Sequence, residues 1–219
     1  MAGILFIISA PSGSGKSTLV SQLRTLVEGL DFSISYTTRA PRGSEEDGRE
    51  YHFTTREEFE RMIGEGQFLE WAQVFGNYYG TSREALEHAH RLGKDLLLDI
   101  DVQGALQVMQ TTPESVSIFV LPPSPEVLER RLRNRSQAEH VSEEAVIRRR
   151  LSQAKEELLR VWDYKYALVN DVLDQAVGEL RAVVLTERGE QGEELRSEAD
   201  RCRTAQEAHR LQPILDRFL

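Results

Sequence analysis

The strongest constraint on this chain is a glycine-rich turn that joins an apolar run, residues 4–8, to a helical pattern that begins at Leu19. The turn reads Ser9-Ala10-Pro11-Ser12-Gly13-Ser14-Gly15-Lys16-Ser17-Thr18. A strand, a glycine-rich turn, Gly-Lys-Ser and a helix, in this order, are typical of a loop that binds phosphate. The glycines let backbone N–H groups converge on anionic oxygens, and the helix N-terminus adds unpaired N–H groups. The sequence therefore predicts a nucleoside triphosphate site at residues 10–18.

Two side chains of this loop have specific expected roles. Lys16 is expected to reach the β- and γ-phosphates, and the hydroxyl of Ser17 to ligate Mg²⁺. One position departs from the G-x-x-x-x-G-K-[ST] pattern, because Ala10 stands in the first glycine slot. Alanine costs little there if its φ stays negative. A Ser/Gly-rich turn without a ligand is the alternative, which the other matching positions disfavour.

Composition and charge narrow the class of protein. The chain has 219 residues and a net charge of −9, which disfavours a surface for nucleic acid. Arginines nevertheless cluster at 130–135 and 148–150, which suggests a small polyanionic ligand; Arg133 and Arg148 are expected instead on exposed helix faces, in ion pairs with glutamates. No apolar run approaches the roughly 20 residues that span a bilayer, and residues 4–8 do not resemble a signal peptide. The single cysteine, Cys202, fits a reducing, cytoplasmic setting and is expected at the surface.

Strands and helices alternate along most of the chain. The continuous apolar runs at 96–101, 116–121 and 166–169 suit parallel strands that are buried on both faces. This rhythm predicts an α/β fold, a parallel sheet flanked by helices, with ligands outside the carboxyl ends of the strands. Asp99, Asp101, Asn170 and Asp171 follow such strands, as the glycine-rich turn does.

Three stretches break this rhythm. Residues 33–82 read as short strands with one helix, including a strand over 32–37, and look like an insertion. A helix that starts at Pro125 is expected to end near residue 133, before a polar stretch at 134–141 and a helix from 142 to about 162. After residue 189 the apolar stripe is thin, which leaves open a helix packed on the core, a partner-binding helix and a frayed tail.

Several of these stretches together resemble guanylate kinases of the nucleoside monophosphate kinase superfamily. They follow in the family's order between residue 4 and about residue 188, and their combination is highly specific. The resemblance is carried by Ala10-Pro11-Ser12-Gly13-Ser14-Gly15-Lys16-Ser17-Thr18, Thr37-Thr38-Arg39-Ala40-Pro41-Arg42, Phe68-Leu69-Glu70-Trp71-Ala72, Gly76-Asn77-Tyr78-Tyr79-Gly80-Thr81, Asp99-Ile100-Asp101-Val102-Gln103-Gly104 and Val169-Asn170-Asp171.

The resemblance implies a P-loop NTPase core over 1–32 and 83–219, a small α+β GMP-binding insertion over 33–82, and a mobile lid over about 134–148. An extra C-terminal helix is expected over about 190–219. The implied reaction is the reversible transfer of the γ-phosphoryl group of ATP to GMP, with Mg²⁺, to give ADP and GDP. ATP and GMP are the implied partners, without nucleic acid or membrane. The sequence leaves open whether dGMP is accepted and whether the chain is a monomer or a homodimer.

The resemblance assigns the GMP phosphate to Arg39, Arg42, Tyr51 and Tyr79. These residue types suit the task, because arginine binds phosphate in bidentate fashion and tyrosine hydroxyls donate at a fixed distance. The alternative for the two tyrosines is a role as core aromatics of a small sheet.

Guanine is assigned to Ser35, Glu70, Thr81 and Asp101. A carboxylate suits guanine because N1–H and the 2-amino group are adjacent donors, whereas adenine would leave the buried carboxylate unpaired. Glu70 is therefore the main candidate for specificity.

The remaining implied roles concern the metal and the phosphoryl group. Asp99 would orient a water on Mg²⁺, with a helix N-cap as its alternative; Asp101 is the other candidate for that cap. Arg131, Arg135 and Arg150 would neutralise charge on the transferring group, and Asn170 would lie beside adenine. Many relatives carry G-R-G after the first lid arginine, whereas this chain has Asn134-Arg135-Ser136 and departs from the family's pattern there.

Two other functions remain as alternatives. A non-catalytic guanylate-kinase-like interaction module is disfavoured by the intact Gly15-Lys16-Ser17. A ribosyl-phosphate kinase on the same core is disfavoured by the complete set of candidate base readers, because a ribosyl phosphate has no base.

Overall fold

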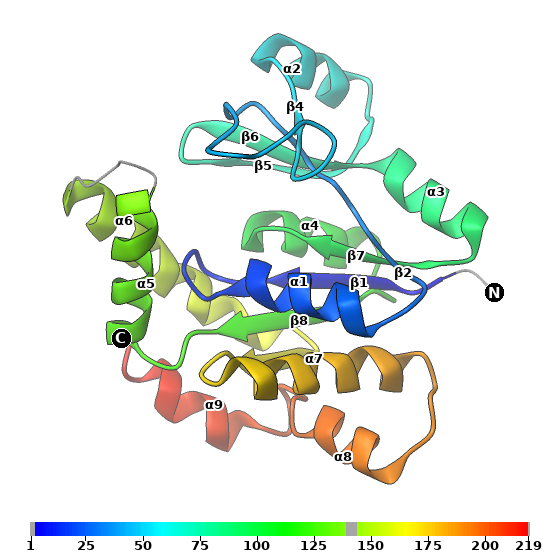
Figure 1. The fold of residues 1–219 in the computed structure, drawn as a ribbon, viewed down its shortest axis with the longest axis vertical. Helices are drawn as coiled ribbons and strands as arrows, with labels where there is room; N and C mark the ends of the chain where they lie inside the picture. The colour runs from blue at the N-terminus through cyan, green and yellow to red at the C-terminus, as the bar shows by residue number, and fades with distance from the viewer. Residues whose placement is uncertain (1–2, 139–143, 219) are drawn as a thin grey trace. The chain divides into compact units, whose positions relative to one another are not determined.

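The structure is a computed structural model that describes residues 3–138 and 144–218 (Figure 1). It contains a five-stranded and a four-stranded sheet. In spatial order, the first runs β2 (Leu30–Phe32), β7 (Asp95–Asp99), β1 (Leu5–Ser9), β8 (Val116–Leu121) and β9 (Tyr166–Val169). The second runs β4 (His52–Phe53), β3 (Tyr36–Thr37), β6 (Asn77–Ser82) and β5 (Phe68–Val74). The β2–β7 and β8–β9 pairs are parallel, which confirms the predicted α/β class with a parallel sheet.

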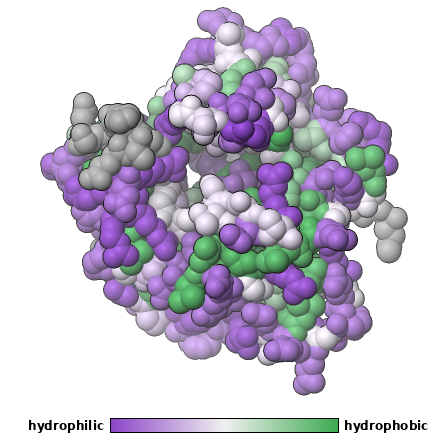
Figure 2. Space-filling view, viewed as in Figure 1, coloured by the Kyte–Doolittle hydropathy of each residue, from purple (hydrophilic) through white to green (hydrophobic). Residues whose placement is uncertain are grey.

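Two compact units make up the chain. One holds the chain up to Ile7 and Gly29–Ser115; the other holds Ile8–Glu28 and the chain from Val116 onwards. Strand β1 contributes residues to both, and all five of its residues are buried. Hydrophilic residues cover much of the face that Figure 2 shows, as the charged fraction of 29% leads one to expect. Within the described residues, no helix is both long and apolar enough to cross a membrane.

The first unit holds the four-stranded sheet and three helices, α2 (Arg56–Gly64), α3 (Arg83–Leu92) and α4 (Val102–Thr111). Each helix begins at a side chain that accepts a backbone N–H, which satisfies one of the groups a helix start leaves unpaired. These N-caps are Thr55, Ser82 and Asp101. The aromatic rings of Phe59 and Phe68 stack at 4.3 Å between centroids, and α2 thereby packs on β5.

The second unit holds the phosphate-loop helix and the C-terminal half of the chain. Its helices are α1 (Lys16–Leu26), α5 (Pro125–Ala138), α6 (Glu144–Leu158), the 3-10 helix η1 (Leu159–Asp163), α7 (Leu173–Glu187), α8 (Glu193–Asp200) and α9 (Ala208–Leu215). All six residues of β8 are buried, as expected for a central strand covered on both faces.

Two predicted element boundaries are wrong. The expected strand over 32–37 is split, because the chain leaves the first sheet after β2 and enters the second at β3. Its backbone partners change accordingly: the N–H of Ser33 donates to Leu97, and the carbonyl of Ser35 accepts from His52.

The helix from Pro125 continues to Ala138 instead of ending near residue 133. Asn134 and Ser136, which stand in the family's glycine positions, cost a helix interior less than glycine does. The following helix begins at Glu144 and passes into η1 at Leu159. Residues 139–143 of the expected polar stretch and lid lie outside the described residues.

The C-terminal segment forms two short helices, and it packs on α7 and β9 (Figure 1). The N–H of Ala167 donates to the carbonyl of Cys202 (2.8 Å), and the N–H of Thr204 donates to that of Lys165 (3.1 Å). Strand β9 lies at the edge of its sheet, so these bonds satisfy backbone groups that an edge strand would otherwise expose.

The surface position expected for Cys202 is wrong, because this residue of the C-terminal segment is fully buried. Burial raises the pKa of the Cys202 thiol to about 12. A free cysteine behaves as a small apolar group, which explains why this position tolerates full burial.

We predict that Leu211→Ala lowers the free energy of unfolding by about 2–5 kcal/mol, because Leu211 is fully buried in α9 and its loss leaves a cavity. His209→Ala, at an exposed position of the same helix, is the matched control. Urea unfolding of both variants measures the difference. If the segment were a frayed tail, the two variants would be equally stable.

Candidate active site

The glycine-rich turn forms a tight loop between β1 and α1. Gly13 and Gly15 have φ of 91° and 87°, in the left-handed region that favours glycine. The N–H of Ser14 donates to Pro11 (3.1 Å), and α1 begins at Lys16. Phe75 is the sole non-glycine residue of the described chain with a positive φ, so Ala10 is not strained in the first glycine slot. The loop therefore has the predicted strand–loop–helix context.

Side chains from two other segments of the second unit donate to the carbonyl oxygen of Ser14. It accepts from Nδ2 of Asn170 (2.8 Å) and from Nη1 of Arg131 (3.2 Å). Arg131 also donates from Nη2 to the carbonyl of Asn170 (3.1 Å). A Cβ on Gly15 would lie 2.3 Å from Nδ2 of Asn170, so glycine is required there for space as well as for φ. The structure thus brings the loop, Arg131 and Asn170 together.

The loop also has polar groups suited to an anionic ligand. The hydroxyl of Ser14 is buried and has no hydrogen-bond partner among the described residues. Ser17 and Thr18, in the first turn of α1, are exposed. Burial, with the charge of Arg130, lowers the pKa of Arg131, which still stays protonated near neutral pH.

The other lid arginines lie on α5 and α6. Arg135 is exposed on α5, whereas Arg150 is buried on α6 and donates to the hydroxyl of Ser136 (3.3 Å). Arg133 pairs with Glu129 and Glu144, as expected for an exposed helix face. The roles of Arg135 and Arg150 toward a phosphoryl group stay predictions.

In the first unit, Arg39 is buried and held by Glu45. Its Nη1 and Nη2 donate to the two carboxylate oxygens of Glu45 at 2.9 and 3.1 Å, and Nη1 also donates to Ala40. Glu45 accepts the backbone N–H of Arg42 as well (2.8 Å). Burial alone would lower the pKa of Arg39, but Glu45 and Tyr79 outweigh it and raise the pKa above its usual value. One carboxylate thus holds the side chain of Arg39 and the backbone of Arg42, the two arginines assigned to the GMP phosphate.

Both predicted tyrosines lie beside Arg39. Its guanidinium carbon is 5.2 Å from the ring centroid of Tyr51, and the rings of Tyr51 and Tyr79 are 5.9 Å apart. Burial and the nearby charge of Asp99 raise the pKa of Tyr51, which keeps its hydroxyl a donor at neutral pH. Asp99 ends β7 and is half-buried.

Three of the four candidate base readers lie close together in the same unit, and the fourth, Asp101, lies at the start of α4. Ser35, Glu70 and Thr81 are buried, Glu70 pairs with Thr81 across β5 and β6, and the hydroxyls of Ser35 and Thr81 are 3.5 Å apart. Asp101 accepts the N–H groups of Gln103 and Gly104, which confirms it as the cap of α4. A buried carboxylate among hydroxyls, rather than apolar groups, suits a base with adjacent donors.

Sequence reasoning missed two residues of this unit. Glu45 stands in a polar loop, six residues after Arg39 and three after Arg42. This short spacing was the one feature of the sequence that could have indicated its contacts with both arginines. Gly104 matters because a Cβ there would lie 2.2 Å from Oε2 of Glu70, and no pattern in the sequence indicates that contact.

The oxygen-bearing side chains near the loop and at the end of β7 decide whether Mg²⁺ could be held. In the part of the chain that the structure describes, no three His, Cys, Asp or Glu residues gather as a metal cage. Mg²⁺ that binds with a nucleotide needs no such cage, because substrate phosphates and water supply most of its ligands. The exposed Ser17 hydroxyl at the loop and the carboxylate of Asp99 at the end of β7 are oxygen donors of the kind it prefers.

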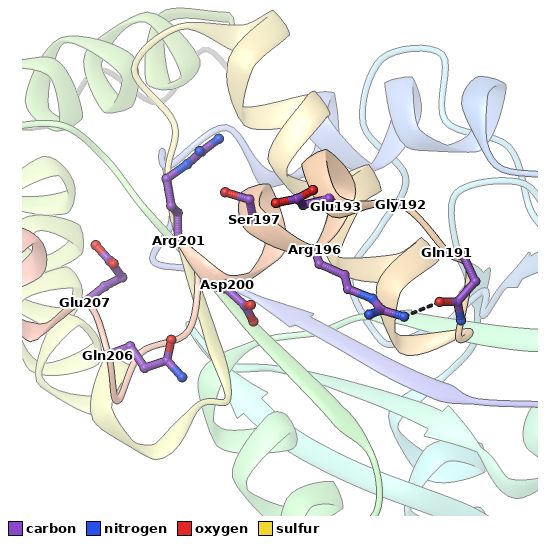
Figure 3. A pocket seen from close by; sticks show the side chains of 9 residues that line it. All are labelled: Gln191, Gly192, Glu193, Arg196, Ser197, Asp200, Arg201, Gln206 and Glu207. Atoms are coloured by element: carbon purple, nitrogen blue, oxygen red, sulfur yellow. Dashed lines mark hydrogen bonds between the residues drawn. The ribbon is translucent and has the colours of Figure 1, made fainter.

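A further pocket, of about 670 Å³, lies in the C-terminal segment between Gln191 and Glu207 (Figure 3). Charged side chains of α8 line it, and Arg196 donates to Gln191. None of the residues that line it belongs to the glycine-rich loop or to the groups assigned to GMP.

A glycine-rich loop of the phosphate-binding type on a parallel α/β core, with a separate set of arginine, tyrosine and carboxylate groups of which Arg39 and Glu70 are buried, defines a nucleotide kinase of the P-loop class. Comparison with known proteins narrows this class. The family model for guanylate kinase matches residues 3–187. Guanylate kinase from Koribacter versatilis is 51% identical over 226 residues, covering 100% of this chain and 97% of that protein. Guanylate kinase from Nitrosospira multiformis is 51% identical over 186 residues, covering 85% of this chain and 87% of that protein.

A solved structure agrees. The crystal structure of guanylate kinase from Anaplasma phagocytophilum has a TM-score of 0.70 and 34% identity, covering 87% of this chain and 88% of that one. This chain belongs to the guanylate kinase family, and it is a nucleoside monophosphate kinase. The interaction module and the ribosyl-phosphate kinase are not favoured.

We predict that the stability advantage of the wild type over Glu45→Gln depends on pH. Burial would raise the pKa of the Glu45 carboxyl, but hydrogen bonds from Arg39 and from the N–H of Arg42 outweigh it and lower the pKa below 4.5. A carboxyl with a lowered pKa stabilises the fold fully above its unfolded pKa and loses that contribution as pH falls through its folded pKa.

The difference in unfolding free energy between the two proteins should therefore be largest at neutral pH and shrink below pH 4.5. Urea unfolding over this range measures it, with Glu46→Gln, at an exposed position of the same loop, as control. A difference that stays constant with pH would contradict the assignment.

Proposed function

We propose that this kinase transfers the γ-phosphoryl group of ATP to GMP by using two separately built half-sites. Residues 10–18, with Asn170, bind ATP, and the first unit binds GMP through Arg39, Arg42, Tyr51 and Tyr79 at the phosphate. The observation that carries the proposal is the buried carboxylate of Glu70 beside the hydroxyls of Ser35 and Thr81. A phosphate acceptor without a base would have no use for such a cluster.

The arginines attract the GMP phosphate by their charge, and the tyrosine hydroxyls orient it by hydrogen bonds. Arg39 is already oriented by Glu45, so binding requires little further ordering of that side chain. Tyr51 and Tyr79 lie beside it and donate their hydroxyls to phosphate oxygens, while Arg42, exposed in the same loop, adds the second positive charge.

Guanine is read by Glu70, which accepts from N1–H and from the 2-amino group. Ser35, Thr81 and Asp101 contact the remaining polar edge of the base. Adenine presents an acceptor at N1 and would leave a buried carboxylate unpaired, which is costly.

Phosphoryl transfer is positioning and electrostatics rather than acid–base chemistry. Lys16 and the loop N–H groups hold the β- and γ-phosphates, and Arg131, Arg135 and Arg150 neutralise charge on the transferring group. Ser17, and Asp99 through a water, would hold Mg²⁺, which when bound would supply positive charge to offset that of the ATP phosphates.

The arrangement of parts is also a proposal. We assign GMP binding to the insertion at 33–82, the core to 1–32 and 83–219, and closure over the reacting groups to a lid at about 134–148. Closure excludes water, so that ATP is not hydrolysed in place of transfer. Because ATP and GMP belong to the nucleotide pool of the cell interior, we place the enzyme in the cytoplasm.

We predict that Glu70→Gln raises KM for GMP by about 10- to 100-fold, because one hydrogen bond to a charged group is lost and an amide donor faces a guanine donor. KM for ATP stays close to that of the wild type. A coupled ADP-release assay measures both, and Glu114→Gln, at an exposed position, is the control. Unchanged kinetics with GMP would remove Glu70 from base recognition.

We predict that Lys16→Met lowers kcat by about 100-fold or more, because a charge directed at the transferring phosphoryl group is lost. KM for GMP changes little, since the lysine belongs to the other half-site. The same assay measures this, with Lys155→Met, at an exposed position of α6, as the control. A variant with normal kcat would show that the loop lysine is not needed for transfer.

A further inference from the structure

Strand β5, which carries Glu70, has a strand neighbour on one side alone. It is the last strand in the order β4-β3-β6-β5, and β6 pairs with one of its edges. An edge strand presents backbone N–H and C=O groups that need other partners. At Trp71, directly after Glu70, a side chain from α4 supplies both.

That side chain is Gln107. The N–H of Trp71 donates to Oε1 of Gln107 (3.3 Å), and Nε2 of Gln107 donates to the carbonyl of Trp71 (2.8 Å). A primary amide is suited to this contact, because it carries a donor and an acceptor on one planar group. Gln107 thus satisfies both the N–H and the C=O of Trp71, as a residue of a neighbouring antiparallel strand would. Gln107 thereby fixes the strand to the helix one residue away from Glu70.

The same helix also sets the position of the Glu70 carboxylate. Asp101, Gly104 and Gln107 follow one another at intervals of three, which places them along one side of α4. A Cβ on Gly104 would lie 2.2 Å from Oε2 and 2.9 Å from Cδ of Glu70. The carboxylate therefore lies directly against the first turn of the helix, and a small change in the spacing of β5 and α4 moves it.

We propose that Gln107 is a positioning residue for guanine recognition: it holds β5 against α4 so that the carboxylate of Glu70 stays aligned with the donor edge of the base. This inference rests on the proposed role of Glu70. Recognition by a carboxylate depends on that alignment, because both oxygens must meet adjacent donors and supporting contacts set their geometry to about 0.5 Å.

A base that lacks one of the two donors separates alignment from general binding. Inosine monophosphate keeps N1–H but has no 2-amino group, so it forms one of the two bonds to Glu70. The wild type should therefore bind GMP more tightly than inosine monophosphate, by the free energy of the hydrogen bond from the 2-amino group to Glu70. If Gln107 aligns the carboxylate, its loss reduces this preference rather than the binding of every substrate alike.

The test compares Gln107→Met, which keeps the length of the side chain and removes both hydrogen bonds, with Gln110→Met, the same change at an exposed position of α4. For each variant, kcat and KM are measured with GMP, inosine monophosphate and ATP, and Tm is recorded. Gln107→Met should raise KM for GMP by about 3- to 10-fold and lower the preference for GMP over inosine monophosphate, with kcat and KM for ATP unchanged. Gln110→Met should behave as the wild type.

A second variant and a double variant distinguish alignment of the carboxylate from a general loss of packing. Gln107→Glu keeps an acceptor for the Trp71 N–H but directs an anionic oxygen at its carbonyl, so it should lose at least as much preference as Gln107→Met. In a Glu70→Gln background, Gln107→Met should add nothing to the loss of preference, because the group that it positions is gone.

Three results would overturn the inference: normal kinetics of Gln107→Met, an equal loss with all substrates together with a lower Tm, or an undiminished effect in the Glu70→Gln background. Normal kinetics of Glu70→Gln with GMP would instead remove the proposed role of Glu70, and the inference with it. A defect in Glu70→Gln with none in Gln107→Met would leave that role standing and refute the role of Gln107 alone.

Discussion

The ion pair between the buried Arg39 and the half-buried Glu45 is the interaction around which Arg39, Tyr51 and Tyr79 of the first unit are arranged. Removing the arginine charge from water is costly, and this cost is offset when the pair is bidentate and its remaining polar groups are satisfied. Both conditions hold here, because Glu45 also accepts the N–H of Arg42 and Arg39 also donates to Ala40. All four residues lie within seven positions of one loop, so the loop supplies its own electrostatic partner. The guanidinium of Arg39 is thereby held in one orientation.

The second constraint is steric: in each unit a polar side chain lies so close to a helix that only glycine leaves room for it. At Gly15 a side chain would strike the amide of Asn170, and at Gly104 it would strike the carboxylate of Glu70. In each case the glycine lets a functional polar group approach a helix start closely. The two glycines differ, however, in backbone conformation. Gly15 has a left-handed φ that already favours glycine, whereas Gly104 lies within α4, where glycine is unfavourable for the helix and is explained by the contact alone.

The sequence was most informative where function depends on local spacing. The phosphate loop, the N-caps and the strands β7, β8 and β9 follow from short patterns, because backbone geometry and burial act over a few residues. It was least informative where two distant segments meet. Nothing local indicates that Gln107 pairs with Trp71, that Glu70 requires Gly104, or that Cys202 is buried. The end of α5 was misjudged for a related reason: Asn134 is common in turns, but the helix continues to Ala138 and Ser136 becomes a buried acceptor for Arg150.

The C-terminal segment connects stability with the phosphate loop inside the second unit. It pairs with β9 through Lys165 and Ala167, and β9 ends immediately before Asn170, which anchors the carbonyl of Ser14. An edge strand that was paired on one side alone would hold its last residue less firmly, because its outer backbone groups would exchange with water. The family match ends at residue 187, yet the relative from Koribacter versatilis aligns over the whole chain. The segment is therefore an addition to the family's core that secures the strand carrying a phosphate-loop anchor.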